Sequence, residues 1–365
     1  MKIAVLTSGG DAPGMNAAIR AISLVGHAQG NEVVGVQHGF AGLLTGDFIA
    51  LPPARTADIL REGGTMLHSA RCREFVEPSV RQTAREQLLA AGVDGLVVIG
   101  GNGSLTGAER LANPDECGDW PVHVIGIPAS IDNDVALTSL SIGVDTAMNT
   151  IVEACDRIAD TAGAHDRTFI IEVMGRDCGY LAMTSAVAGG ADMVLFPEAE
   201  RTESELVQAV VSAVLAVRAH HGPSQKVLAI KAEGIPTSTE RLKELVDAEL
   251  CRQLDDGVEI ETRVTVLGHI VRGGRPSAFD RLLGSRFGNV AARAIARGVH
   301  RKMVAWMPPF DIAPEVGERS TDDPYCYLVE LSAALDATHE LLNGQSSLAR
   351  WRSTIFDEFE SVFLV

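Results

Sequence analysis

Short runs of apolar, largely β-branched residues alternate along the chain with segments in which apolar residues repeat at helical spacing. The runs predict strands at 3–6, 33–36, 96–99, 122–127, 168–173, 193–196, 227–230, 264–267 and 303–306. Helical periodicity predicts helices at 15–25, 79–90, 145–159, 204–218, 241–254 and 328–342. This alternation indicates an α/β protein whose parallel sheets carry helices on both faces. Ligands bind such sheets beyond the carboxyl ends of the strands, so the loops there are the places to look for chemistry.

Chain length and net charge limit the possible number of domains and the kinds of ligand that the protein can bind. A chain of 365 residues is longer than one hydrophobic core usually supports, so two domains are expected rather than a single large α/β domain. Hydrophobic residues make up 46% of the chain and charged residues 22%, which is typical of a folded globular protein. The formal charge of −17 disfavours binding to nucleic acid or to an anionic membrane. A polyanionic substrate would therefore need a locally positive pocket.

The first residues of the chain and the spacing of its cysteines indicate the cellular compartment of the protein. Met1 and Lys2 lead directly into an apolar strand-like run, and no stretch reaches about 18 uncharged apolar residues. We therefore expect a cytoplasmic protein. Six scattered cysteines show no CxxC spacing, which predicts reduced thiols rather than a disulfide or zinc framework. They are Cys72, Cys117, Cys155, Cys178, Cys251 and Cys326.

Two glycine-rich turns follow predicted strands and precede predicted helical segments. The first contains GGDAPG at residues 9–14, and the second is GGNGS at 100–104. Glycine lets the backbone approach a ligand closely, and free N–H groups at a helix start favour phosphate. Neither turn is a Walker loop or a dinucleotide fingerprint. One such turn is weak evidence, but two indicate a site for an oligophosphate.

A third loop carries two carboxylates after the run at 122–127. In SIDND, at residues 130–134, Asp132 and Asp134 are two positions apart. One carboxylate can accept a proton from an attacking hydroxyl while the other helps to hold Mg²⁺. Taken alone, the segment would be an Asx-rich turn with solvated acids. The two neighbouring phosphate-type turns favour the catalytic interpretation.

Further candidate residues follow in the second half of the chain. The segments are MGRDCG at 174–179, KAEG at 231–234 and RVTVLGHIVRGG at 263–274. Arginine grips phosphate oxygens through two hydrogen bonds, and a loop glutamate can accept hydrogen bonds from sugar hydroxyls. Each of these residues taken singly would more often be an ordinary surface or structural side chain.

Taken together, these segments resemble the phosphofructokinase A family. The shared motifs are GGDAPGMNAAIR (9–20), GGNGS (100–104), SIDND (130–134), EVMGR (172–176) and VLGHIVRGG (266–274), in family order and at family spacing. The resemblance extends from residue 2 to about 283, and more faintly to the end. It implies transfer of the terminal phosphoryl group of ATP to the 1-hydroxyl of fructose 6-phosphate, giving fructose 1,6-bisphosphate in glycolysis, with Mg²⁺ as cofactor.

The resemblance also implies an architecture. It predicts two Rossmann-like three-layer domains with mainly parallel sheets and the active site in the cleft between them. Residues 1–143 and about 273–313 would form the phosphoryl-donor domain, and 144–272 with about 314–365 the sugar-phosphate domain. It further implies a homotetramer or homodimer that grips the sugar phosphate across a subunit interface.

Roles for individual residues follow from the same resemblance. The implied catalytic residues are Asp132, Ser130 and Arg176. The implied donor-binding residues are Gly10, Arg71, Cys72, Asn102, Gly103, Ser104 and Gly107, and the implied metal-binding residues are Asn102 and Asp134. The implied sugar-phosphate residues are Arg167, Met174, Gly175, Arg176, Glu233, Arg263, His269 and Arg272, of which Arg167 and Arg263 match arginines lent by a neighbouring subunit.

Several positions depart from the family pattern. Asn102 stands where most members carry an aspartate that helps to hold Mg²⁺, so a neutral amide oxygen replaces a charged ligand. Leu24 and Ala159 replace arginines that bind effectors in regulated bacterial members. Residues 317–365 exceed the length of compact members and receive no assigned role.

The donor remains open between two alternatives. Small residues at Gly103 and Ala129 favour ATP, because pyrophosphate-using members resemble a pattern with aspartate and lysine at these two places. Pyrophosphate-dependent transfer is the alternative. A binding-only regulatory paralogue is a further possibility, although such a protein would have no chemical need for the base Asp132.

Overall fold

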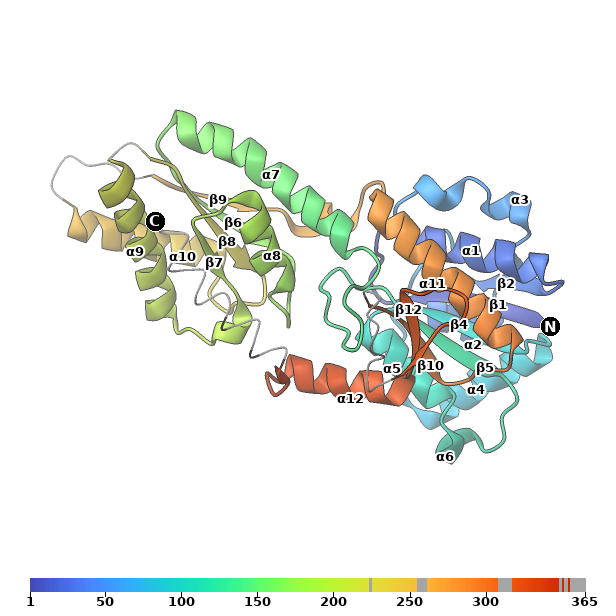
Figure 1. Ribbon diagram of the computed structural model, residues 1–365. Helices are drawn as coiled ribbons and strands as arrows, with labels where there is room; N and C mark the ends of the chain where they lie inside the picture. The colour runs from blue at the N-terminus through green and yellow to red at the C-terminus, as the bar shows by residue number, and fades with distance from the viewer. Residues whose placement is uncertain (223–224, 255–260, 308–316, 348–349, 351–353, 355–365) are drawn as a thin grey trace. The chain divides into compact units, whose positions relative to one another are not determined.

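The computed structural model describes all residues except 223–224, 255–260, 308–316, 348–349, 351–353 and 355–365. The chain divides into two compact units (Figure 1), unit 1 being Met1–Thr146 with Arg272–His339 and unit 2 Ala147–Val271 with Glu340–Val365. The sequence predicts crossings after residues 143, 272 and about 313, whereas the units change after 146, 271 and 339. The third crossing is a correction. Unit 1 continues to His339 because the strand Cys326–Glu330 pairs with its sheet.

Unit 1 is built on one sheet. Its described strands are β1 (Lys2–Ser8), β2 (Glu32–Val36), β3 (Phe48–Ala50), β4 (Gly95–Gly100), β5 (His123–Pro128), β10 (Lys302–Trp306), β11 (Glu318–Arg319) and β12 (Cys326–Glu330). In these described residues they form eight strands in the order β11-β12-β10-β5-β4-β1-β2-β3. The central strands run parallel, while β3 and β12 run antiparallel to their neighbours.

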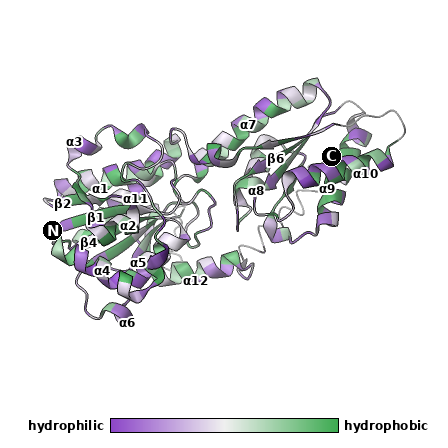
Figure 2. Ribbon diagram, turned by 180° about the vertical axis from the view of Figure 1, so that it is seen from behind, coloured by the Kyte–Doolittle hydropathy of each residue, from purple (hydrophilic) through white to green (hydrophobic). Residues whose placement is uncertain are grey.

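The helices of unit 1 connect these strands. They are α1 (Met15–Ala28), α2 (Gly39–Thr45), α3 (Pro53–Thr56), α4 (Pro78–Ala90), α5 (Asn102–Leu111), α6 (Pro114–Cys117), α11 (Ala278–Ala296) and α12 (Leu331–Leu342), with short 3₁₀ helices η1 (Ile59–Arg61) and η2 (Arg73–Val76). The strands are hydrophobic along almost their whole length, and the helices alternate hydrophobic and hydrophilic faces (Figure 2). β4 is buried at every position, as expected for a central strand covered on both faces.

Unit 2 contains a smaller, wholly parallel sheet. Its described strands are β6 (Thr168–Val173), β7 (Met193–Leu195), β8 (Val227–Ala232) and β9 (Thr262–Val266), in the order β7-β8-β6-β9. Its helices are α7 (Val144–Ala164), which begins at the crossing from unit 1, α8 (Tyr180–Gly189), α9 (Glu203–His221), α10 (Thr239–Gln253), η3 (Pro197–Ala199) and η4 (Gly268–Arg272). The predicted α/β class with mainly parallel sheets is confirmed.

The predicted element pattern misses several short elements, such as α2, α8 and β3, and it differs from the structure at two longer ones. The helix predicted at 328–342 begins as strand β12, and α12 starts only at Leu331. The long helix α11 escaped prediction because Gly284 and Gly288 interrupt its apolar pattern. A Cβ on Gly284 would lie 2.6 Å from the Gly14 carbonyl oxygen, and one on Gly288 2.5 Å from that of Ala18. These glycines allow α11 to lie directly against α1 (Figure 1).

Two further observations concern the whole chain. No helix in the described residues combines the length and apolarity that a membrane crossing requires. Cys155 and Cys326 are buried thiols, and burial raises their pKa to about 11 and about 12. Neutral thiols of this kind are poor nucleophiles.

A buried carboxylate fastens α11 to the start of α7 within unit 1. Asp280 accepts hydrogen bonds from the Gly143 N–H at 2.8 Å, the Thr146 N–H at 2.8 Å and the Thr146 hydroxyl at 2.5 Å. Ser277 caps α11 by accepting a hydrogen bond from the N–H of Asp280. Burial raises the pKa of Asp280 to about 6, although these hydrogen bonds oppose the shift.

We expect Asp280→Asn to lower the thermal unfolding midpoint, and to do so more at pH 4 than at pH 7. Folding raises the pKa of Asp280 from near 4 to about 6. Protonation of Asp280 therefore stabilises the folded state fully below pH 4, and this stabilisation is lost as the pH rises through about 6. The difference amounts to about 3 kcal/mol for a shift of this size. Calorimetry of both proteins at several pH values measures it, and a pH-independent difference would contradict the prediction.

Candidate active site

The three turns singled out by sequence lie side by side at one edge of the unit 1 sheet. β1, β4 and β5 are parallel neighbours, so their carboxyl ends meet there. A Cβ on Gly9 would lie 3.2 Å from the Ser104 Oγ, and one on Gly101 would lie 3.4 Å from the Ser130 Cβ. The predicted residues placed at this edge are Gly10, Asn102, Gly103, Ser104, Ser130, Asp132 and Asp134.

The acidic loop after β5 is organised by the residue between its two aspartates. Buried Asn133 adopts a left-handed backbone conformation (φ 50°) and donates from its amide to the Ser139 carbonyl at 3.2 Å. Its Oδ1 accepts a hydrogen bond from the Ser141 N–H at 3.0 Å. Asparagine tolerates this conformation better than most residues, which explains its place in the motif. Asp132 and Asp134 on either side are partly exposed.

Ser130 and Asp134 form a direct pair in this loop. The Ser130 hydroxyl donates to the Asp134 Oδ1 at 2.5 Å. This hydrogen bond engages the Oδ1 of Asp134, while the second carboxylate oxygen, Oδ2, can face a ligand. We expect Ser130 to orient this carboxylate as well as to lie beside Asp132.

The segment with Arg71 and Cys72 lies against the first glycine turn. The Ser69 hydroxyl donates to the Gly9 carbonyl at 2.5 Å, which ties the two together. Arg71 is exposed and free to reach a ligand, while Cys72 is half-buried and burial raises its thiol pKa. The thiol is therefore a packing group rather than a reactive one.

Arg272, predicted to bind the sugar phosphate, lies in unit 1 beside the donor turn. Its Nη1 contacts the Asp11 carbonyl oxygen at 3.4 Å, and a Cβ on Gly10 would lie 2.7 Å from the same nitrogen. The absence of a side chain at Gly10 leaves room for this guanidinium close to the turn. The arrangement places a permanent positive charge where the phosphate-binding backbone lies, which is the local field that an acidic protein needs for a polyanion.

The oxygen ligands at this edge fit a magnesium ion. Mg²⁺ is usually held by one or two carboxylates together with substrate phosphates. Asp134 offers a carboxylate, and the Asn102 Oδ1 receives only a long contact, 3.5 Å, from the Thr106 hydroxyl. No group of three or more His, Cys, Asp or Glu suited to a metal occurs in the described residues. Asp134 and Asn102 offer the one or two protein oxygens that Mg²⁺ usually takes when substrate phosphates supply other ligands.

In unit 2, the predicted sugar-phosphate loops are neighbours at the carboxyl end of the parallel sheet. The Glu233 N–H donates to the Val173 carbonyl at 2.8 Å, and the Gly234 N–H to the Gly175 carbonyl at 3.1 Å. The Leu267 N–H donates to the Glu172 carbonyl, which brings the third loop beside them. The predicted residues at this edge are Met174, Gly175, Arg176, Glu233 and His269.

Arg167 and Arg263 lie at the opposite end of the same sheet. Arg167 directly precedes β6, and Arg263 is the second residue of β9. Both form ion pairs with Glu261, Arg167 at 2.6 Å. Desolvation opposes ionisation of Glu261, but the two arginines outweigh it and lower its pKa. Across the six residues of β6, roughly 20 Å separate these arginines from the Met174 loop. One chain does not bring the two groups together.

A buried ion pair under the sugar-phosphate loops was missed by sequence reasoning. Lys231 is 1% exposed, and its Nζ donates to the Glu172 Oε2 at 3.1 Å and to the Ala232 carbonyl at 3.4 Å. The Thr239 hydroxyl donates to the same glutamate oxygen. The pair joins β6 and β8 one or two positions before their loops begin. An isolated lysine within an apolar strand is the only sequence signal for it.

The C-terminal residues lie beside the predicted transfer arginine. A cavity of about 740 Å³ in unit 2 is lined by Arg176, Asp177 and Gly234 together with Asn343, Arg350 and others. Part of the C-terminal stretch, which received no role from the sequence, therefore lines space next to Arg176.

Known proteins that are similar in sequence to this chain are phosphofructokinases. A sequence profile described as Phosphofructokinase matches residues 2–295. An ATP-dependent 6-phosphofructokinase of Clostridium acetobutylicum is 44% identical over 302 residues, covering 83% of this chain and 88% of that protein. One of Natranaerobius thermophilus is 42% identical over 316 residues, covering 86% and 91%.

Solved structures share the fold. A Pichia pastoris phosphofructokinase in the T-state superposes with a TM-score of 0.84 at 30% identity, over 99% of this chain and 42% of the larger Pichia chain. A pyrophosphate-dependent phosphofructokinase of Marinobacter aquaeolei superposes with a TM-score of 0.75 at 20% identity, covering 92% and 84%. The profile match and the relatives show that this chain belongs to the phosphofructokinase family.

Proposed function

We propose that this chain is an ATP-dependent 6-phosphofructokinase that converts fructose 6-phosphate to fructose 1,6-bisphosphate. The observation that carries the proposal is the edge of the unit 1 sheet, where two phosphate-type turns, the Asp132 loop and Arg272 come together. Relatives that are 42–44% identical over most of their length are named for the same activity.

The residues divide the chemistry among themselves. Asp132 accepts the proton of the attacking sugar 1-hydroxyl, because a carboxylate is a competent base for a hydroxyl that is being phosphorylated. Backbone N–H groups at the start of α5 and the Arg272 guanidinium hold donor phosphates. Arg176 neutralises charge on the transferring group. Glu233 and His269 bind the sugar phosphate.

Mg²⁺ is the proposed cofactor, held by Asn102 and Asp134. When bound, it would neutralise negative charge on the donor phosphates. Ser130 keeps Asp134 oriented for this role through the 2.5 Å hydrogen bond.

ATP is favoured over pyrophosphate by the space beside the second glycine turn. Apart from its chain neighbours and the nearby backbone of its own helix, no atom of the described residues lies within 4 Å of the place that a Cβ on Gly103 would take. The α-phosphate and ribose of a nucleotide need such open space at the helix start, whereas pyrophosphate does not.

A spectrophotometric assay of fructose 6-phosphate with ATP, and separately with pyrophosphate, tests the proposal. We expect turnover with ATP and little with pyrophosphate. Faster turnover with pyrophosphate would overturn the donor assignment. No turnover with either donor would favour the binding-only alternative.

The neutral residue at the metal position gives a separate prediction. Asn102→Asp is expected to lower the Mg²⁺ concentration for half-maximal rate about two- to tenfold, because it adds a charged ligand at the N-terminus of α5. The Michaelis constant for fructose 6-phosphate should stay unchanged, since other residues bind the sugar.

A Mg²⁺ titration of both proteins with saturating ATP makes the measurement, with Thr106→Ser as a control that keeps the hydroxyl bonded to Asn102. Unchanged or weaker metal dependence in the aspartate variant would show that position 102 is not a metal ligand.

A further inference from the structure

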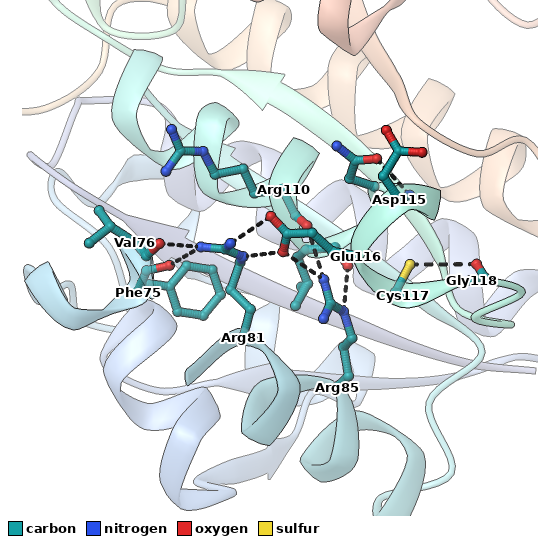
Figure 3. A network of polar contacts seen from close by, with 11 residues as sticks. Phe75, Val76, Arg81, Arg85, Arg110, Asp115, Glu116, Cys117 and Gly118 are labelled. Atoms are coloured by element: carbon teal, nitrogen blue, oxygen red, sulfur yellow. Dashed lines mark hydrogen bonds and ion pairs between the residues drawn. The ribbon is translucent and has the colours of Figure 1, made fainter. Parts of the chain in front are cut away.

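Three charged side chains form a compact cluster behind the donor-binding elements of unit 1 (Figure 3). Glu116 accepts from Arg81 at both oxygens, from Nε at 2.7 Å and from Nη2 at 2.6 Å, and its Oε2 also accepts from Arg85 at 3.3 Å. The side chains of Arg81 and Arg85 are only 2% and 4% exposed. We call Arg81, Arg85 and Glu116 the Glu116 clamp.

Arg81 reaches from the clamp to the segment that follows Arg71. Its Nη1 donates to the carbonyl oxygens of Phe75 at 2.8 Å and Val76 at 2.7 Å (Figure 3). These carbonyls end η2, the 3₁₀ turn that begins directly after Cys72. Arg81 therefore fixes the end of η2, the turn that directly follows Arg71 and Cys72 in the chain.

Arg85 reaches to the far end of the phosphate-binding helix. Its Nε donates to the Leu111 carbonyl at 2.9 Å and its Nη2 to the Arg110 carbonyl at 3.0 Å. These carbonyls lie at the C-terminal end of α5, whose first residues are Asn102–Ser104 of the glycine turn. The clamp thus holds both elements to which donor binding is assigned.

Between the two elements lies a packed aromatic contact. The Phe75 ring stacks on Phe40, with centroids 4.1 Å apart. A Cβ on Gly107 would lie 2.9 Å from Phe40 and 3.4 Å from Phe75, so α5 packs directly on this pair. Since Phe75 belongs to η2, a shift of η2 would move the ring and open the wall between η2 and α5.

The two buried arginines depend on Glu116 for their charge balance. A buried guanidinium without its carboxylate is strongly unfavourable, so loss of Glu116 would draw both arginines toward water. Hydrogen bonding from Arg81 lowers the pKa of Glu116, so the clamp is ionised at neutral pH. Glu116 sits on α6, a short turn held at its start by Asn113, which accepts a hydrogen bond from the Asp115 N–H.

We propose that Glu116 is a positioning residue for the phosphoryl donor. It acts through Arg81 and Arg85, which hold η2 and α5 at the spacing that the nucleotide requires, and it does not touch the donor. The inference rests on the proposed function, because it assumes that Arg71 and the start of α5 bind ATP.

The test is Glu116→Gln, which keeps the shape of the side chain but removes its charge. We expect the dissociation constant for MgATP, measured by isothermal titration calorimetry, to rise about 5- to 50-fold, because small misplacements of binding groups weaken ligand contacts steeply. The dissociation constant for fructose 6-phosphate should stay within about twofold. Hydrogen exchange should quicken in the peptide that covers η2.

Glu109→Gln is the matched control. Glu109 lies on α5 and is 13% exposed, and it pairs with Arg301 rather than with the clamp. It should lose a comparable ion pair without weakening MgATP binding. Glu116→Asp, which keeps the charge, should recover most of the affinity lost in Glu116→Gln.

Two results would overturn the proposal. One is an unchanged MgATP dissociation constant in folded Glu116→Gln. The other is an equal loss in Glu109→Gln, which would indicate general destabilisation. Binding is read without turnover, so a wild-type protein that binds MgATP but does not phosphorylate fructose 6-phosphate would refute the proposed function and still test the clamp.

Discussion

Asp132→Asn is expected to lower turnover with ATP and fructose 6-phosphate by roughly 10²- to 10⁴-fold, the usual cost of removing a general base. The dissociation constant for fructose 6-phosphate should change by only a few-fold. The reason is that the amide keeps the size of the carboxylate but cannot accept the proton of the 1-hydroxyl. Steady-state assays and calorimetric binding measure the two quantities separately.

The geometry of the loop makes this variant interpretable. Asn133 holds the loop through its contacts with Ser139 and Ser141, and replacing Asp132 leaves these two hydrogen bonds in place. The thermal unfolding midpoint should therefore stay near that of the wild type. Asn133→Ala is the contrasting control, because it removes those bonds and should lower both turnover and the unfolding midpoint. Near-wild-type turnover in Asp132→Asn would contradict the assignment of Asp132 as the general base.

The turns of the candidate site could be predicted because their signal is local. A β-branched run followed by glycines or aspartates identifies a strand end, and parallel strands place such ends at one edge of a sheet. The order of β5, β4 and β1 then brings the Ser130 loop beside the Ser104 turn. Local patterns therefore sufficed to place these turns at one edge of the sheet.

Side-chain networks could not be predicted because their members are far apart in sequence. Arg81 and Glu116 are separated by 35 positions, and Lys231 and Glu172 by 59. Arginine or glutamate on a helix is usually solvated, and only the folded structure shows that Arg81 is buried and paired with Glu116. In the same way, the helical pattern at 328–342 hid β12, whose identity as a strand depends on pairing with β10.

Arg263→Ala is expected to raise the Michaelis constant for fructose 6-phosphate by roughly 30- to 150-fold, as loss of charge-assisted hydrogen bonds worth about 2–3 kcal/mol would do. The position of Arg263 in the sheet suggests that it acts on a sugar phosphate bound by a second copy of the chain. Arg263 and Arg167 meet at Glu261, at the end of the sheet opposite to Glu233 and His269. A sugar phosphate held by Glu233 would therefore need these arginines from a second copy.

The strand β9, which carries Arg263 near its start, offers an exposed edge that suits such a partner. β9 is an edge strand of the unit 2 sheet. Val266, at its end, is 49% exposed and Ile270 is 68% exposed, which is unusual for large apolar side chains near a strand edge. We therefore expect an interface between copies to cover this edge.

Mixed oligomers of two variants test whether Arg263 acts in the active site of a neighbouring subunit. At fructose 6-phosphate concentrations no higher than the wild-type Michaelis constant, Arg263→Ala and Asp132→Asn chains are each expected to be almost inactive alone. They should regain activity when co-expressed with different affinity tags and purified as hybrids. In a purified hybrid dimer, one of the two sites combines an intact base with a lent arginine, so recovery should approach about half of wild-type activity, and in purified, randomly mixed hybrid tetramers about two sites in seven should do so. Arg241→Ala, which removes an exposed arginine of unit 2 with surface partners, should be fully active by itself. Purified hybrids without regained activity, or a wild-type monomer with full activity at assay concentration, would rule out arginines lent between subunits.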